Sequence, residues 1–105
     1  MKIAYASTDG ITINTKFCSS TIFYIYEKEG KESRFIDRRW ISDAASLCGR
    51  SEYLDEFIEI VAAELKDCQV ICAAKFSFES MRKLRKQGIK CLTSKGGRVV
   101  DNLPK

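Results

Sequence analysis

The sequence predicts a single α/β domain with a mixed five-stranded sheet, and three observations support that fold class. Two strand-like runs separated by a glycine turn indicate a β-hairpin near the amino terminus. One long segment has apolar residues at helical spacing, and a short continuous apolar run follows it, as in a buried parallel strand. The chain has 105 residues, which is enough for one hydrophobic core and too few for two domains.

The first third of the chain is predicted to be rich in strands. The segment KIAYAS, residues 2–7, is a short apolar run that ends at the turn signal Asp9-Gly10. The segments TIFYIYEKEG and SRFIDRRW, residues 21–30 and 33–40, read as strands separated by a turn that contains glycine. We therefore expect one strand followed by a β-hairpin.

The middle of the chain is predicted to be helical. Ser42 is placed to cap a short helical turn that closes at Gly49. Ser51 is then expected to cap the clearest helix, residues 52–67. Its apolar residues recur at helical spacing: Leu54, Phe57, Ile58, Val61, Ala62 and Leu65.

The last third alternates between strand and helix. CQVICAA, residues 68–74, is the continuous apolar run, and Ser77 is expected to cap a basic helix over residues 78–87 that Gly88 ends. IKCLTS, residues 89–94, is the last predicted strand. The predicted order is therefore β-β-β-α-β-α-β, with right-handed crossovers that place the strands in one helix-covered sheet.

Composition and charge exclude several classes of protein. Eighteen Lys and Arg against fourteen Asp and Glu give a net charge of +4, which favours anionic partners only where it is concentrated. The chain has no histidine and so lacks the usual general base at neutral pH, and we predict that it is not an enzyme. Because the first residues do not form an export signal and no apolar run could span a bilayer, we expect a cytoplasmic protein without a membrane partner.

The five cysteines favour free thiols in a reducing compartment, because the chain shows no export signal. Cys18 lies in a loop beside Lys16, a cation that would favour the thiolate, although a packing or turn-capping role fits equally well. Cys72 lies near the end of its strand and is interpreted either as a ligand-contacting thiol or as a core residue. The remaining thiols are given no ligand role: Cys48, Cys68 and Cys91.

Two loops are predicted to adjoin at the carboxyl ends of the parallel strands, where open α/β sheets bind their ligands. They are residues 8–21, after the first strand, and residues 73–79, before the basic helix. The second loop offers backbone amides at a helix start with Lys75 nearby, which suits an anion. A simple turn capped by Ser77 explains the same pattern.

The helix after the second loop carries a run of cations: Arg82, Lys83, Arg85 and Lys86. We interpret them as the solvated face of an amphipathic helix, because no aromatic side chains that could stack on bases are interleaved with them. We therefore expect no nucleic-acid partner.

Several motifs follow one another in an order that is typical of one family. The chain begins MKIAYASTDG, continues through Asn14 and KFCSSTIFYIYE, and later reads LKDCQVICAAKFSFESMRKLRKQGIKCL. In this order the motifs resemble the dinitrogenase iron-molybdenum cofactor biosynthesis family, of the NifX and NifB carboxyl-terminal type, over the whole chain apart from residues 31–49. The resemblance implies a ribonuclease H-like fold over residues 1–105 and binding of an iron-sulfur or molybdenum-containing cluster that is carried rather than transformed.

The chain departs from the family pattern at several positions. The family motif N-x-H-F-G falls on Asn14 to Cys18, so Lys16 replaces the histidine expected as a cluster ligand and Cys18 replaces the glycine. A protonated lysine attracts an anionic cluster without ligating it, whereas a Cys18 thiolate is a soft ligand for iron, copper or molybdenum-sulfur species. Phe76 and Ser77 stand where the family has isoleucine and glycine, a change expected to narrow the mouth of the site.

The resemblance and the loop positions together predict a cluster site between the two loops. Its metal ligands are expected to be Cys18 and Cys72. Its other contacts are expected at Asp9, Asn14, Lys16, Phe17, Lys75 and Ser77. The predicted function is non-enzymatic carriage of an iron-sulfur or iron-molybdenum type cluster, with cluster-assembly proteins as partners. The alternative is a divergent scaffold or small-anion-binding protein that has lost cluster binding, and the oligomeric state is left open.

Overall fold

The computed structural model describes residues 1–94, and its elements follow one another in the predicted order. The strands are β1 (Lys2–Ala6), β2 (Ile22–Glu29), β3 (Glu32–Trp40), β4 (Val70–Ala73) and β5 (Lys90–Thr93). The α-helices are α1 (Leu54–Glu64) and α2 (Phe78–Lys86). Short 3-10 helices are η1 (Phe17–Ser19), η2 (Ser42–Leu47) and η3 (Ser51–Tyr53). The sequence also predicts at most one helical turn in the tail from Gly96, and those residues lie outside the described range.

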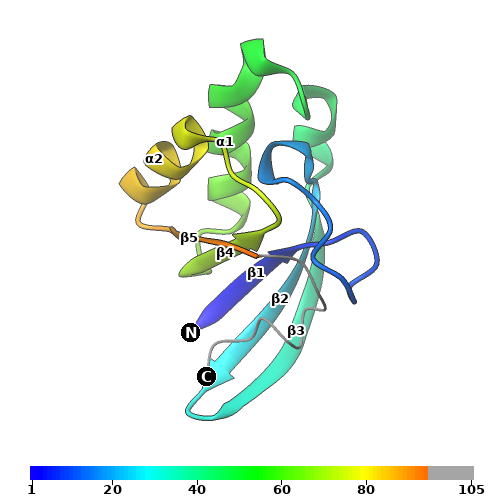
Figure 1. The fold of residues 1–105 in the computed structure, drawn as a ribbon, viewed down its shortest axis with the longest axis vertical. Coiled ribbons are helices and arrows are strands. Elements are labelled where there is room, and N and C mark those ends of the chain that lie inside the picture. Colours follow the sequence, from blue (N-terminus) through cyan, green and yellow to red (C-terminus); the bar gives the residue numbers. More distant parts are fainter. Residues whose placement is uncertain (95–105) are drawn as a thin grey trace.

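The five strands form one mixed sheet in the spatial order β3-β2-β1-β4-β5 (Figure 1). β1 pairs antiparallel with β2 and parallel with β4, and β4 pairs parallel with β5. β2 and β3 are the predicted hairpin, and Gly30 allows its turn because its φ of 60° lies in the left-handed region. Since β1 and β4 run side by side in the same direction, the loops that follow them leave the sheet at the same edge.

Side chains alternate between the two faces of the sheet. Ala4 and Ile71 belong to the main core, which is filled from the helical layer by α1 and α2; its buried helical members include Phe57, Ile58, Val61, Ala62 and Leu84. Figure 1 shows both α-helices on the same side of the sheet. The neighbouring strand residues Ile3, Tyr5, Val70 and Cys72 face the other way, into a smaller cluster that Ile13 of the first loop completes. The period-two alternation of the strands therefore assigns each side chain to one of two separate environments.

The helix starts differ from the sequence prediction at two of three serines. Ser77 caps α2 as predicted, because its Oγ accepts the Ser80 amide at 3.1 Å. Ser42 and Ser51 are instead the first residues of 3-10 helices that have no side-chain cap, and α1 begins only at Leu54. In these tight turns a preceding carbonyl oxygen accepts the amide that a serine hydroxyl was expected to satisfy.

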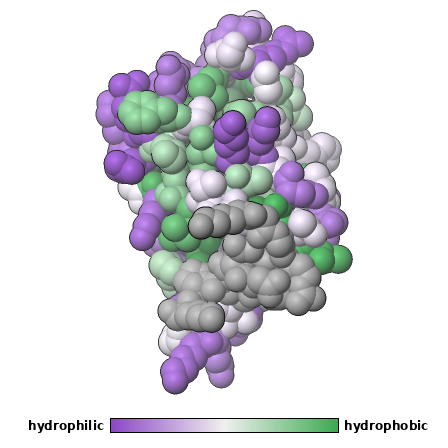
Figure 2. All heavy atoms as spheres, viewed as in Figure 1, coloured by the Kyte–Doolittle hydropathy of each residue, from purple (hydrophilic) through white to green (hydrophobic). Residues whose placement is uncertain are grey.

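The surface is hydrophilic at both ends of the long axis, including the end that carries the β2–β3 turn (Figure 2). β3 lies at one edge of the sheet and leaves Phe35 and Trp40 exposed.

Candidate functional site

The two loops that the sequence predicts to adjoin lie side by side in the structure. The Phe17 amide donates to the Lys75 carbonyl oxygen at 2.8 Å. The Ala74 amide donates to the Thr15 carbonyl oxygen at 3.0 Å, and Lys16 and Lys75 form an isolated parallel bridge. The parallel strands β1 and β4 therefore bring their loops to a shared edge, as expected for an open α/β sheet.

A pocket of about 300 Å³ opens beside these loops, and we call it the thiol pocket. Three residues predicted at the site line it: Lys16, Cys18 and Ser77. The other lining residues come from η1, from α1 and from the stretch between the last residue of η2 and the first residue of η3: Ser19, Leu47, Gly49, Arg50, Ser51, Leu54 and Phe57. The wall of the pocket therefore combines apolar side chains with two cations, one thiol and several hydroxyl groups.

Phe17 fixes the position of Cys18. Its fully buried ring stacks on Phe76 with the ring centroids 5.4 Å apart and the planes inclined by 21°. It also meets Phe57 edge-on at a centroid distance of 5.7 Å. Because Phe76 belongs to the second loop, these contacts join the two loops through the core. Phe17 is thus an anchor behind the pocket, and the half-buried Cys18 beside it reaches the pocket itself.

Asp9 and Asn14 shape the first loop and do not line the thiol pocket. The Asp9 Oδ1 accepts the amides of Ile11 and Thr12, each at 2.9 Å. These hydrogen bonds, led by that from Thr12, lower the pKa of the Asp9 carboxyl. The Asn14 Oδ1 accepts the Thr8 amide at 3.2 Å, so that both polar side chains satisfy the turning backbone.

The structure does not bring the two predicted metal ligands together. Cys72 lies opposite Tyr5 in the parallel register and faces the smaller cluster, where it is 3% exposed. Burial raises the pKa of its thiol to about 11. Cys18 lines a pocket with Leu54 of α1, on the helix-covered side of the sheet. Lys75 is exposed and joins the first loop through its backbone, without lining this pocket.

Cys48 is the thiol that sequence reasoning placed nowhere near the site. Its Sγ donates to the Cys18 carbonyl oxygen at 3.7 Å, and the Gly49 amide donates to the same oxygen at 2.9 Å. Burial, and then the neighbouring Cys18, raise the pKa of the Cys48 thiol. The contact joins residues thirty positions apart in the sequence, so no local motif could indicate it.

The sequence pattern of the dinitrogenase iron-molybdenum cofactor family matches residues 1–105. The chain belongs to this family. Membership implies a part in iron-molybdenum cofactor biosynthesis or binding. No protein with curated annotation matches the chain.

Solved structures of six chains are similar to this member of the dinitrogenase iron-molybdenum cofactor family, and one of them is titled "Crystal structure of PH0822". The two share 15% sequence identity at a TM-score of 0.71, with 96% of this chain and 85% of the other covered. The similarity confirms the single α/β domain with its mixed sheet and helices. The ribonuclease H-like classification stays a prediction.

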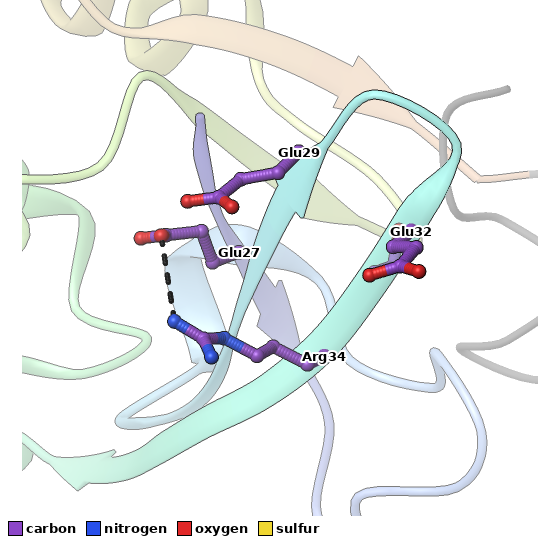
Figure 3. Close-up of a pocket in the computed structure, with 5 residues that line it drawn as sticks. Glu27, Glu29, Glu32 and Arg34 are labelled. Carbon is purple, nitrogen blue, oxygen red and sulfur yellow. Dashed lines mark ion pairs between the residues drawn. The ribbon is translucent and has the colours of Figure 1, made fainter.

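A second pocket, of about 280 Å³, lies on the β2–β3 hairpin, and we call it the hairpin pocket. It is lined by Glu27, Glu29, Glu32, Ser33 and Arg34. Figure 3 shows three carboxylates from the two strands around it, with Arg34 directed at Glu27, 3.9 Å away. This excess of negative charge is the wrong sign for the anionic cofactor suggested by the family name.

The described residues also limit which protein ligands a bound metal could have. Within residues 1–94, no three side chains of His, Cys, Asp or Glu gather in a way that could hold a metal ion. A metal in the thiol pocket would therefore need ligands of its own in addition to protein sulfur. In the same part of the chain, no helix has the length and apolar character needed to cross a membrane.

Proposed function

We propose that this member of the dinitrogenase iron-molybdenum cofactor family carries an anionic iron-sulfur or molybdenum-sulfur cluster in the thiol pocket. The observation that supports the proposal best is the composition of the pocket wall, where the Cys18 thiol lies in the same pocket as the cations Lys16 and Arg50. The cluster is cargo in this proposal, delivered by one cluster-assembly protein and released to another.

The charge of the wall favours such a cargo. Lys16 and Arg50 contribute two positive charges, and no carboxylate is among the described residues that line the pocket. Ser77, the N-cap of α2, also lines the pocket, so the positive end of the helix dipole adds to the same field. Thiometallate and iron-sulfur clusters carry negative charge and would be attracted for this reason.

The thiol in the pocket wall also favours a metal-sulfur cluster as the cargo. A thiolate is a soft ligand that suits iron, copper and molybdenum-sulfur species, while protonated lysine contributes charge alone. Cys18 lines a hollow whose wall also includes the apolar side chains of Leu54 and Phe57. Apolar walls around a few polar groups are typical of small-ligand sites. Carriage requires only that the cargo be held and released, which these groups suffice to do without a catalytic base.

Anaerobic titration tests the proposal. The reduced protein is titrated with tetrathiomolybdate and, separately, reconstituted with ferrous iron and sulfide, and uptake is followed by visible absorption and by metal analysis after gel filtration. We expect one cluster per chain in the wild type and a loss of at least about tenfold in affinity for Cys18→Ser. Cys91→Ser is the matched control, because Cys91 is also half-buried but lies on β5. No uptake by the wild type, or equal uptake by both variants, would rule out this site.

A second candidate is a small-anion site in the same pocket, and one observation favours it. Lys16, Arg50 and the start of α2 would attract an oxyanion without any help from sulfur. Titration with molybdate separates the two functions, since oxyanion binding should survive Cys18→Ser and fall with Arg50→Ala. Cluster uptake should respond to both substitutions.

A further inference from the structure

We infer that Cys18 and Cys48 together form a two-thiolate site for a thiophilic metal or metalloid centre at the edge of the thiol pocket. The inference rests on the proposed function and deepens it, because it places a second protein sulfur beside the same pocket, between the lining residues Leu47 and Gly49. Neither the family resemblance, which leaves out residues 31–49, nor the cysteine spacing along the chain indicates this pair.

Two hydrogen bonds fix the relative position of the two residues. The Cys18 carbonyl oxygen accepts the Cys48 thiol at 3.7 Å and the Gly49 amide at 2.9 Å. The backbone around Cys18 is held in turn by the η1 turn, where the Ser20 amide donates to the Phe17 carbonyl oxygen at 3.0 Å. Both segments are therefore anchored by backbone contacts, which hold the Cys48 sulfur against the backbone of Cys18.

The local structure around Cys48 explains why its side chain points at the first loop. η2 ends at Leu47, which packs against the main core, and the Cys48 amide donates to the Ala45 carbonyl oxygen at 3.4 Å. Gly49 then turns the chain with a φ of 75°, a conformation that glycine adopts without strain. Arg50 follows and lines the pocket. The reversal thus presents a thiol, a backbone amide and a cation to the same loop.

Exposure separates this pair from Cys68 and Cys72, and position separates it from Cys91. Cys68 and Cys72 are buried, at 2% and 3% exposed, whereas Cys18 and Cys48 are both half-buried. Cys91 is also half-buried but lies on β5, against the main core. Among the described residues, the Cys48 thiol thus contacts the backbone of Cys18, whose own side chain lines a surface hollow that a reagent can enter.

The chemistry of the site follows from its two sulfurs. Binding forms two bonds from sulfur to the centre and releases two thiol protons to solvent, with no change of oxidation state. The described residues offer no third His, Cys, Asp or Glu at this point, so the centre keeps its remaining ligands, such as inorganic sulfide in a cluster. Thiolate sulfur selects thiophilic centres over magnesium or calcium.

Phenylarsine oxide is the probe, because it condenses with two neighbouring thiols to form two arsenic–sulfur bonds and release one water. The full-length reduced protein is treated with one equivalent and then challenged with excess monothiol, and intact mass spectrometry reports the adduct. We expect the wild type and Cys91→Ser to retain the adduct. Cys18→Ser and Cys48→Ser should lose it, and Cys48→Ala should behave like Cys48→Ser. An adduct that survives in either Cys48 variant, or a wild type that forms none, would overturn the inference.

Circular dichroism on each variant shows whether the fold is retained, and the Cys48→Ala variant offers a second measurement if Cys48→Ser fails to fold. The tetrathiomolybdate titration is then repeated with the Cys48 variant that folds, where we expect affinity to fall about tenfold or more. If that variant binds tetrathiomolybdate with wild-type affinity, Cys48 does not take part in binding the cargo. If the wild type captures the arsenical but takes up no cluster, the result contradicts the proposed function and still supports the two-thiolate site.

Discussion

The thiol pocket and the hairpin pocket have nearly the same volume, about 300 and about 280 Å³, but the side chains that line them carry opposite charge. The thiol pocket joins segments that are far apart in the sequence, and aromatic rings buried beneath it hold them together. The hairpin pocket lies on two consecutive strands, and carboxylates dominate its wall. Volume therefore says little about which hollow binds a ligand, whereas the wall charge and the burial of the supporting side chains separate the two.

The largest expected effect comes from removing the aromatic support of the thiol pocket. Phe17→Ala deletes a fully buried ring that packs on Phe23, Phe57 and Phe76, and we expect the free energy of unfolding to fall by about 3–5 kcal/mol. Urea denaturation followed by circular dichroism measures it. Phe35→Ala on the hairpin is the control, because that ring is 54% exposed and should cost about 1 kcal/mol or less. Similar losses in both variants would contradict the contrast between the regions.

Substitution of two glycines tests the same contrast between the first loop, beside the thiol pocket, and the hairpin. Gly10 and Gly30 both have positive φ values, of 75° and 60°, in the first loop and in the hairpin turn. A Cβ added at Gly10 would lie 2.5 Å from the Tyr24 ring, whereas one added at Gly30 would meet nothing within 4 Å. We expect Gly30→Ala to cost about 1–2 kcal/mol from the left-handed backbone alone. Gly10→Ala should cost about 3 kcal/mol, because crowding against Tyr24 adds to the same strain. Equal shifts in the urea midpoint would mean that the Tyr24 ring moves aside without cost.

Charge reversal sharpens the electrostatic side of the comparison. Lys16→Glu places a carboxylate in the thiol pocket, and we expect tetrathiomolybdate affinity to fall about tenfold, or about 1.4 kcal/mol, with a smaller loss at high salt. Lys31→Glu in the hairpin turn changes the net charge by the same amount at an exposed position. It should leave the affinity within about twofold, because screening weakens charges that lie beyond the Debye length. If both variants lose affinity equally, net charge rather than the pocket governs binding.

The fold could be predicted from the sequence because its signals are local, and the site could be predicted only in part. The continuous apolar run before the second loop, the Ser77 cap and the Gly88 stop each depend on a few neighbouring residues, and the structure confirms them. Lys16, Cys18 and Ser77 were placed together by the rule that parallel strands deliver their loops to one edge.

The other features of the site depend on the register of the strands and on contacts between residues far apart in the sequence, so no short sequence motif predicts them. Cys72 follows the same edge rule as Cys18, but its pairing opposite Tyr5 turns the thiol toward the other face of the sheet. Cys48 contacts Cys18, and Arg50 lines the pocket, only because η2 and the Gly49 turn fold back onto the first loop. Ser42 and Ser51 failed as predicted caps because a 3-10 start satisfies its amides with backbone carbonyl oxygens instead.

The smallest expected effect concerns the ion pair that ties the hairpin to the helical layer. Arg39 of β3 donates from Nη1 and Nη2 to the two Asp67 carboxylate oxygens at 2.6 and 2.7 Å, and Lys2 donates to the same carboxylate at 3.3 Å. The Arg39 guanidinium holds the pKa of Asp67 well below its usual range. The Asp67 side chain is 36% exposed, so solvent screening limits the contribution of the pair to about 1 kcal/mol.

Asp67→Asn should therefore lower the free energy of unfolding by about 1 kcal/mol at pH 7. Because the folded-state pKa is lowered, the stabilisation is fully present above the unfolded-state pKa of about 4 and is lost as pH falls toward the folded-state value. The difference between wild type and Asp67→Asn should then shrink between pH 5 and strongly acidic pH, which urea midpoints across that range measure. Asp43→Asn, on the exposed η2 turn, should show no such pH-dependent difference. A gap of constant size at every pH would show that Asp67 holds β3 by shape and hydrogen bonding rather than by its charge, and the hairpin would then be attached without an electrostatic term.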